Sequence, residues 1–203
     1  MTPERHSDEE LLLAMRSGDE EAFVTLYRRR QGAIYRFALH MTGSASTAED
    51  ITQDVFLALI REKCAYDPQK GTLPGYLFGI ARKLVLRHLE RGRLAAEQDR
   101  DSEGRSVAEV AVTADPMTDL MHREGVAELR RAVLALPKRY REVVVLCDLE
   151  EMDYAAAAVV LECPIGTVRS RLHRARFLLF DRLRHKIEPP RRLGGLNPAR
   201  SLI

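Results

Sequence analysis

A break of only three residues separates two helical segments near the carboxyl end of the chain. The first segment, DYAAAAVVL, ends at Leu161, residues 162–164 form the break, and the second segment begins at Ile165. Alanines in the first segment leave room for another helix to cross it closely. Two helices joined by so short a turn form a helix-turn-helix, so the sequence predicts an all-α unit at this end of the chain.

The second of these helices carries a strongly basic surface. Val168, Leu172 and Ala175 recur at helical spacing and form its predicted buried stripe. Residues 164–186 hold seven basic side chains against Asp181 alone. A solvated basic face would also give this pattern, but the preceding turn favours a helix that enters the major groove of DNA, where arginine binds guanine with two hydrogen bonds. The predicted DNA-binding residues are Thr167, Arg169, Ser170, Arg171, His173, Arg174 and Arg176.

Four further helices are predicted before residue 93. Their apolar residues recur at helical spacing, and capping residues or glycines mark their ends. Four such helices can form one small bundle. The predicted helices run from Ser7 to Gly18, from Asp19 to Gly43, from a capping box of Ser46 and Glu49 onward, and from about Pro74 to Leu89.

Charge divides the chain into segments that its net charge of +2 conceals. Residues 1–93 carry a net charge of +1, residues 94–124 carry −5, and residues 125–203 carry +6. An acidic stretch without a sustained apolar stripe is typical of a linker. We therefore predict two small helical domains, 1–93 and 125–186, which are joined by an acidic linker at 94–124 and followed by a flexible basic tail at 187–203.

The chain lacks the patterns of several protein classes. Its longest uninterrupted apolar run, Tyr154 to Leu161, is far shorter than the ~20 residues that span a bilayer, and no charged-then-apolar leader opens the chain. Its three cysteines form neither a disulfide framework nor a zinc pattern, which predicts free thiols in the cytoplasm. No metal-ligand, nucleophile or phosphate-loop motif occurs, so we predict no catalytic residue, no cofactor and no metal.

One helix in the first domain presents acidic side chains on an exposed face. Asp50 and Asp54 lie four residues apart, with Gln53 beside them. Like charges at this spacing cost about a few tenths of a kcal/mol, a cost that a basic protein partner would offset. The favourable effect of acids near a helix amino terminus explains the same pattern without a partner. From these residues alone, a solvated face is the favoured interpretation.

Aromatic and basic residues gather around the loop and helix that follow. Lys83, Arg87 and Arg91 recur every four residues and form a stripe that could face phosphates. Neighbouring aromatic rings could stack on unpaired bases. Taken alone, Tyr76 is better explained by core packing, and the basic stripe by a solvated surface. The candidate set for single-strand binding is Tyr66, Lys70, Tyr76, Arg82, Lys83, Arg87 and Arg91.

These segments, in this order, resemble a bacterial RNA polymerase sigma factor of the extracytoplasmic-function (ECF) group. In the first domain the resemblance runs through AEDITQDVFLALIRE and YDPQKGTLPGYLFGIARKLVLRHLERGR, and in the second through ALPKRYREVVVLCDLEEMDYAAAAVVLECPIGTVRSRLHRAR. The resemblance implies a transcription initiation factor, without catalysis of its own, that binds core RNA polymerase, recognises promoter DNA and helps to melt it. It also implies an anti-sigma factor as a further partner, and no small-molecule substrate.

The resemblance gives a role to each group of candidate residues by position. It implies that Asp50, Gln53 and Asp54 bind the clamp helices of the polymerase, which reverses the interpretation from the residues alone. It implies that residues 66–91 recognise and open the minus-ten promoter element, with the loop 66–73 near a flipped base. Contacts to bases of the minus-thirty-five element are implied for Arg169, Ser170, Arg171 and Arg174, and contacts to phosphates for His173 and Arg176.

The chain departs from the family pattern at several positions. Tyr76 stands where family members often have Trp, and Lys83 stands where they often have Asn, which leaves the preferred minus-ten sequence open. Glu and Ile are usual among positions 155–157, where this chain has alanines in a run from Ala155 to Ala158, and Glu162 replaces a frequent turn glycine. These changes alter the polarity of the surface and the conformation of the turn rather than the packing of the motif.

Two other functions are compatible with parts of the sequence. A dimeric helix-turn-helix repressor or activator would use residues 1–93 for dimerisation or for ligand binding. Tight binding of the free protein to two-fold symmetric half-sites would support that alternative. A small helical nucleic-acid hydrolase ranks below it, because no carboxylate or histidine cluster has metal-ligand spacing.

Overall fold

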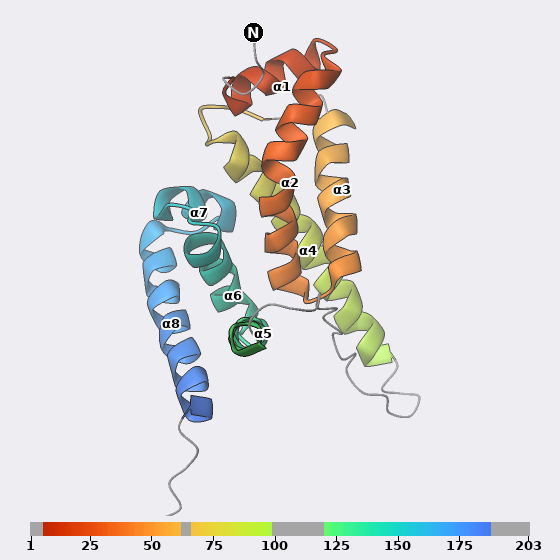
Figure 1. The fold of residues 1–203 in the computed structure, drawn as a ribbon. Helices are drawn as coiled ribbons and strands as arrows, with labels where there is room; N and C mark the ends of the chain where they lie inside the picture. Colours follow the sequence, from red (N-terminus) through yellow and green to blue (C-terminus); the bar gives the residue numbers. More distant parts are fainter. Residues whose placement is uncertain (1–5, 62–65, 99–119, 188–203) are drawn as a thin grey trace, which may run out of the picture.

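The computed structural model describes residues 6–61, 66–98 and 120–187, and these ranges contain helices and no strand, as the sequence predicts (Figure 1). They form two helical bodies. The first body consists of α1 (Asp8–Arg16), α2 (Glu20–Thr42), α3 (Ala45–Arg61) and α4 (Leu73–Gln98). The second body consists of α5 (Leu120–Leu134), α6 (Lys138–Val144), the π-helix η3 (Val145–Leu149), α7 (Tyr154–Leu161) and α8 (Ile165–Ile187).

Residues at the helix ends explain where α1 and α2 begin and stop. The Ser7 hydroxyl accepts a hydrogen bond from the Glu10 backbone N–H at 3.1 Å, and the Glu10 carboxylate accepts one from the Ser7 N–H at 2.7 Å. The predicted capping box is therefore confirmed. Asp19 caps α2 in the same manner, accepting from the Ala22 N–H at 3.1 Å. Gly43 ends α2 at φ 76°, a left-handed conformation that a Cβ atom would disfavour.

The amino terminus of α3 differs from the prediction. The helix begins at Ala45, and the Ser44 hydroxyl accepts a hydrogen bond from the Thr47 backbone N–H at 3.3 Å. Ser46 instead lies inside the first turn, where its hydroxyl is 3.1 Å from the Ser44 hydroxyl. Both serines fit the capping preference, so local sequence alone did not decide between them.

Helix α4 continues beyond the predicted end near Leu89. Arg93 pairs with Glu90 at 2.7 Å and with Glu97 at 2.5 Å, and pairs at this spacing support the additional turns. The first residues of the predicted linker, 94–98, are therefore helical. The rest of that linker up to residue 119, and the predicted tail from residue 188 onward, lie outside the described residues.

The predicted helix-turn-helix is formed by α7 and α8. The Asp153 carboxylate accepts hydrogen bonds from the backbone N–H groups of Ala155 and Ala156, both at 2.9 Å, and so caps α7. Glu162 ends α7 with φ 53°, the left-handed conformation for which glycine is favoured. Before α7, the α-helix α6 passes at Val145 directly into the π-helix η3.

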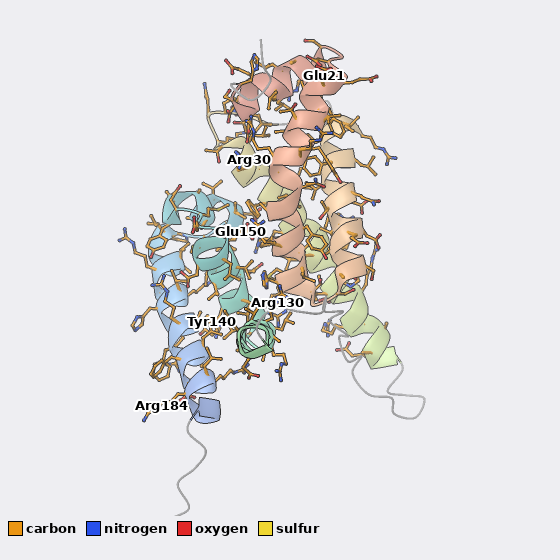
Figure 2. All side chains as sticks on the ribbon, in the orientation of Figure 1. Glu21, Arg30, Arg130, Tyr140, Glu150 and Arg184 are labelled. Carbon is orange, nitrogen blue, oxygen red and sulfur yellow. The ribbon has the colours of Figure 1, made fainter. Side chains whose placement is uncertain are left out.

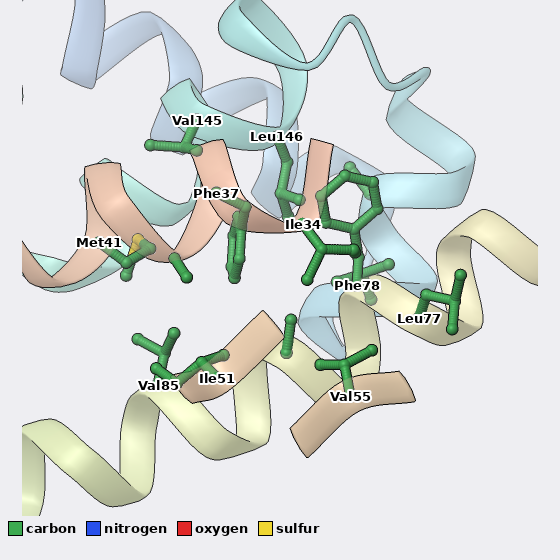
Figure 3. Packing of buried hydrophobic residues seen from close by; sticks show 14 of the residues in the cluster. Ile34, Phe37, Met41, Ile51, Val55, Leu77, Phe78, Val85, Val145 and Leu146 are labelled. Atoms are coloured by element: carbon green, nitrogen blue, oxygen red, sulfur yellow. The ribbon is translucent and has the colours of Figure 1, made fainter. Parts of the chain in front are cut away.

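The two bodies lie side by side, and side chains from both meet at the boundary between them (Figure 2). Ile34 and Phe37 of α2 and Phe78 of α4 pack in one apolar cluster with Val145 and Leu146 of η3 (Figure 3). All five side chains are at most 6% exposed. The ring centroids of Phe37 and Phe78 lie 5.6 Å apart in an edge-to-face arrangement. The core of the first body therefore continues into the second.

Candidate nucleic-acid and protein-binding surfaces

Helix α8 carries the predicted base-reading side chains outside its buried stripe, and most of them are exposed. Val168, Leu172 and Ala175 are at most 2% exposed and fix the buried face. The Arg174 guanidinium lies 5.4 Å from the centroid of the Phe177 ring, a cation–π contact that orients it along the helix. Of the predicted residues, Thr167 and Arg171 are half-buried, and the exposed ones are Arg169, Ser170, His173, Arg174 and Arg176.

Arg176 is bound to a carboxylate within the protein. Its guanidinium donates hydrogen bonds to the two Asp148 oxygens at 3.0 and 2.5 Å. This pairing, with a smaller contribution from Tyr154, raises the pKa of Arg176 above its usual value. The pair ties α8 to η3, so it fixes the orientation of the basic helix relative to the rest of its body. A phosphate contact by Arg176, the role expected from the sequence, would compete with these hydrogen bonds to Asp148.

The predicted single-strand surface contains a packed aromatic pair. The ring centroids of Tyr66 and Tyr76 lie 5.7 Å apart, and the Tyr66 hydroxyl donates a hydrogen bond to Glu9 at 3.3 Å. Burial raises the pKa of the Tyr66 phenol, and the neighbouring Glu9 carboxylate raises it further. Lys70 pairs with Asp67 at 3.6 Å on the exposed loop. Farther along α4, the exposed basic residues are Lys83, Arg87 and Arg91.

Arg82 belongs to the same predicted set but makes an ion pair across the boundary between the two bodies. Its Nε atom donates to the Glu142 carboxylate of α6 at 2.9 Å, and the two side chains are 17% and 4% exposed. A carboxylate buried this deeply needs a cationic partner. The sequence analysis did not identify Glu142, although a lone acid directly before the apolar run Val143–Leu146 is a signal of a buried partner.

The predicted polymerase-binding residues Asp50, Gln53 and Asp54 are all exposed on α3. In Figure 1, α3 lies on the opposite side of α2 from the second body. Gln53 also lines a hollow of about 350 Å³ between α2 and α3. The sequence analysis missed the other side chains around this hollow, although those on α2 recur at helical spacing. They are Tyr27, Arg28, Gln31, Gly32 and Tyr35 of α2 and Glu49 of α3.

Within residues 6–61, 66–98 and 120–187, which the structure describes, no group of three or more His, Cys, Asp or Glu side chains could hold a metal ion. No helix in the same part of the chain is long and apolar enough to cross a membrane.

Comparison with known families assigns one region to each body. Residues 26–94 match Sigma-70 region 2, and residues 127–178 match Sigma-70, region 4. The ECF RNA polymerase sigma factor EcfG of Rhodopseudomonas palustris is 31% identical over 140 residues, which cover 69% of this chain and 73% of that protein. The chain belongs to the ECF group of RNA polymerase sigma factors. It is a promoter-specific transcription initiation factor that binds RNA polymerase.

Other relatives agree with this family. The ECF RNA polymerase sigma factor SigE of Mycolicibacterium smegmatis is 36% identical over 173 residues, which cover 82% of this sigma factor and 65% of that relative. The solved structure of the sigma factor RpoE in complex with the anti-sigma factor NepR, from Bartonella quintana, is similar with a TM-score of 0.65 and 25% identity. That match covers 80% of this chain and 96% of the other. Family membership favours an initiation factor over a dimeric repressor.

Proposed function

We propose that three separate helix faces of this sigma factor perform docking, promoter melting and promoter recognition. The observation that carries the proposal is the exposed arginine face of α8, directly after the turn at residues 162–164, in a chain that also contains region 2. Helix α3 binds core RNA polymerase through Asp50, Gln53 and Asp54. The minus-thirty-five element is bound by Thr167, Arg169, Ser170, Arg171, His173, Arg174 and Arg176, and the minus-ten element is bound by Tyr66, Lys70, Tyr76, Arg82, Lys83, Arg87 and Arg91.

The proposed domains follow the two bodies. Domain two comprises residues 1–93, which contain α1, α2, α3 and most of α4. Domain four comprises residues 125–186 and contains the helix-turn-helix. The acidic stretch up to residue 124 connects them, and residues 187–203 form a basic tail. The protein itself carries out no catalysis and works in the cytoplasm, where the polymerase is found.

Reconstituted transcription tests the proposal as a whole. Core RNA polymerase, this protein and fragments of the genomic DNA that encodes it are combined, and the 5′ ends of the transcripts are mapped. Discrete start sites should appear only when both proteins are present, each preceded by a shared pair of sequence elements. The absence of specific starts on every fragment would refute the proposal.

The docking face is tested by charge reversal. The variant Asp50→Lys/Asp54→Lys should lose binding to core polymerase, because it replaces the acids that would meet a basic partner. Glu20→Lys/Glu21→Lys makes the same charge change at exposed positions of α2 and should still bind. Binding is measured by co-migration with the polymerase in size-exclusion chromatography. If both variants co-migrate with the polymerase equally well, the docking assignment is refuted.

The role of α8 is tested at single-base resolution. Arg174→Ala should reduce binding by about 1–3 kcal/mol and relax specificity at one base position of the minus-thirty-five element. Arg182→Ala removes another exposed arginine farther along α8 and should leave specificity unchanged. Holoenzyme binding to a set of single-base promoter variants provides the measurement. A uniform loss over all sequences would identify Arg174 as a phosphate contact instead.

An inhibitory protein partner is the remaining part of the proposal. The similar sigma factor RpoE was solved in complex with the anti-sigma factor NepR. We expect a comparable anti-sigma protein to bind this chain and to be recovered with it from its native cytoplasm. A recovered partner that leaves reconstituted transcription unchanged would not be an anti-sigma factor.

A further inference from the structure

We propose that Glu9 of α1 positions the ring pair Tyr66–Tyr76, so that the first helix of the chain takes part in minus-ten recognition. This role rests on the function proposed above, which assigns both tyrosines to the minus-ten surface. The match to Sigma-70 region 2 begins at residue 26, so family membership gives α1 no role. Contacts of α1 with α2 and with the loop before α4 carry the assignment.

Helix α1 is held in a fixed orientation against α2. The Asp8 carboxylate is 5% exposed, and its two oxygens accept hydrogen bonds from Arg29 at 2.8 Å and from Arg30 at 2.5 Å. Charge-assisted hydrogen bonds of this kind fix geometry as well as charge. Leu12, one turn farther along the helix, is 2% exposed and lies in the core. The side chain next to Asp8, Glu9, therefore projects from a helix whose rotation is fixed.

Glu9 binds the first residue of the loop 66–73. Its Oε1 atom accepts a hydrogen bond from the Tyr66 hydroxyl at 3.3 Å, and both side chains are half-buried. In Figure 1, α1 crosses the end of the bundle beside this loop. A hydrogen bond to a carboxylate is stronger than one between neutral groups. The contact thus directs the phenol oxygen of Tyr66 toward a helix 57 positions away in the sequence.

The Tyr66 ring is held at its other side by Tyr76 of α4. The two ring centroids lie 5.7 Å apart, and the ring planes are tilted by 56°. Offset and edge-to-face arrangements of aromatic rings are both favourable, so a ring contact alone permits the Tyr66 ring to slide and tilt. The hydrogen bond from the end of the ring to Glu9 selects one of these arrangements. Glu9 therefore determines how the ring pair is presented.

A ring that is fixed before DNA arrives binds an unpaired base at lower cost. Unpaired bases stack on aromatic rings, and a surface that is already ordered loses less conformational entropy on binding. The single O–H donor of Tyr66 is also committed to Glu9, which leaves the ring rather than this donor to the base. Loss of Glu9 should therefore weaken the contact with one base. Phosphate contacts by the exposed Arg87 should be unaffected.

Binding of the holoenzyme to forked DNA tests this role in the full chain. The templates are fragments of a promoter identified by the transcription assay, and they present the minus-ten element as a single strand. Further templates each lack one base of that strand but keep its backbone. The affinity of the holoenzyme for each template is measured by competition against a fluorescent fragment. The affinity lost when a base is removed reports what the protein gains from that base.

The variants separate the hydrogen bond from other effects of the same side chains. Glu9→Ala removes the acceptor, and Tyr66→Phe removes the donor but keeps the ring. Glu9→Gln keeps an acceptor oxygen at the same position. The matched control is Glu21→Ala, because Glu21 is an exposed acid at the second position of α2, just as Glu9 is the second residue of α1. Both positions experience the same helix dipole.

The expected result is a loss that depends on one base. Glu9→Ala and Tyr66→Phe should each weaken binding to the complete forked template about three- to tenfold, and the double variant should bind no more weakly than the weaker single variant. On the template that lacks one particular base the difference from wild type should vanish, because the ring then has no base to bind. Glu9→Gln should recover most of the affinity, and Glu21→Ala should bind like the wild type.

Two kinds of failure are distinguishable. Wild-type affinity of Glu9→Ala, additive losses in the double variant, or the same loss on every template overturns the positioning role of Glu9. A uniform loss of that kind would mark Glu9 as a purely structural residue. Unchanged affinity of Lys83→Ala/Arg87→Ala, which neutralises two exposed basic residues of α4, overturns the proposed minus-ten surface instead. Indifference of the wild type to every missing base has the same consequence.

Discussion

The Arg82–Glu142 pair joins the two bodies in a buried setting, and its strength can be worked out from the structure. Two unit charges 2.9 Å apart attract each other by about 6 kcal/mol at an effective dielectric constant of about 20. Removing both groups from water consumes much of that attraction, although the side chains remain 17% and 4% exposed. We therefore expect a coupling free energy of about 2–3 kcal/mol between them.

A double-mutant cycle measures this coupling. Wild type, Arg82→Met, Glu142→Gln and the double variant are unfolded with urea, and the free energy of unfolding is obtained from the ellipticity at 222 nm. The single changes should each cost about 2–4 kcal/mol, because each leaves a buried charge unpaired. The double variant should cost clearly less than the sum of the two, because both buried charges are then gone.

A second cycle on an exposed pair provides the control. Arg93 and Glu90 lie 2.7 Å apart, but their side chains are 56% and 57% exposed. Solvent screening should reduce their coupling to a small fraction of that expected for Arg82 and Glu142. A coupling at Arg82–Glu142 that is no larger than the control value would refute the reasoning that burial strengthens the pair.

Three further predictions concern local contacts. Asp153→Ala should cost about 1 kcal/mol of unfolding free energy, measured with urea, because α7 loses its cap, whereas Asp153→Asn should retain most of it. Asp148→Asn should release Arg176 for phosphate binding and steepen the salt dependence of promoter binding by about one ion, so an unchanged slope contradicts this role. Burial, aided by Arg130, lowers the pKa of His40 below its ordinary 6.5. Because the unfolded chain then binds more protons than the folded protein, the free energy of unfolding should fall as the pH drops below about 6.5. The melting temperature of His40→Gln should depend less on pH across this range than that of the wild type.

Most helices could be predicted because their signals are local. The capping box at Ser7 and the αL glycine at position 43 mark helix ends through contacts within a few residues. The helix-turn-helix was found from its short break and small residues. The start of α3 was misplaced because Ser44 and Ser46 both fit the capping preference, and no local signal in the sequence marked the π-helix at 145–149.

The candidate surfaces, too, could be predicted only where the signal is local in the sequence. The exposed arginines of α8 and the acids of α3 follow from helical periodicity, because burial of the apolar stripe leaves the opposite face in solvent. Periodicity does not show which exposed-looking charge meets a charge elsewhere in the fold. Arg176 and Arg82 were predicted to contact DNA, and the structure gives them the partners Asp148 and Glu142.

The sequence by itself determined the helical class, the helix-turn-helix, the family and the faces that carry charge, since each depends on residues close together along the chain. Only the tertiary structure decided how the two bodies meet. That contact joins Arg82 to Glu142 and Arg36 to Glu150, pairs separated by 60 and 114 positions. No periodic pattern links residues so far apart, because their attraction depends on burial, and burial is created only when the helices pack together.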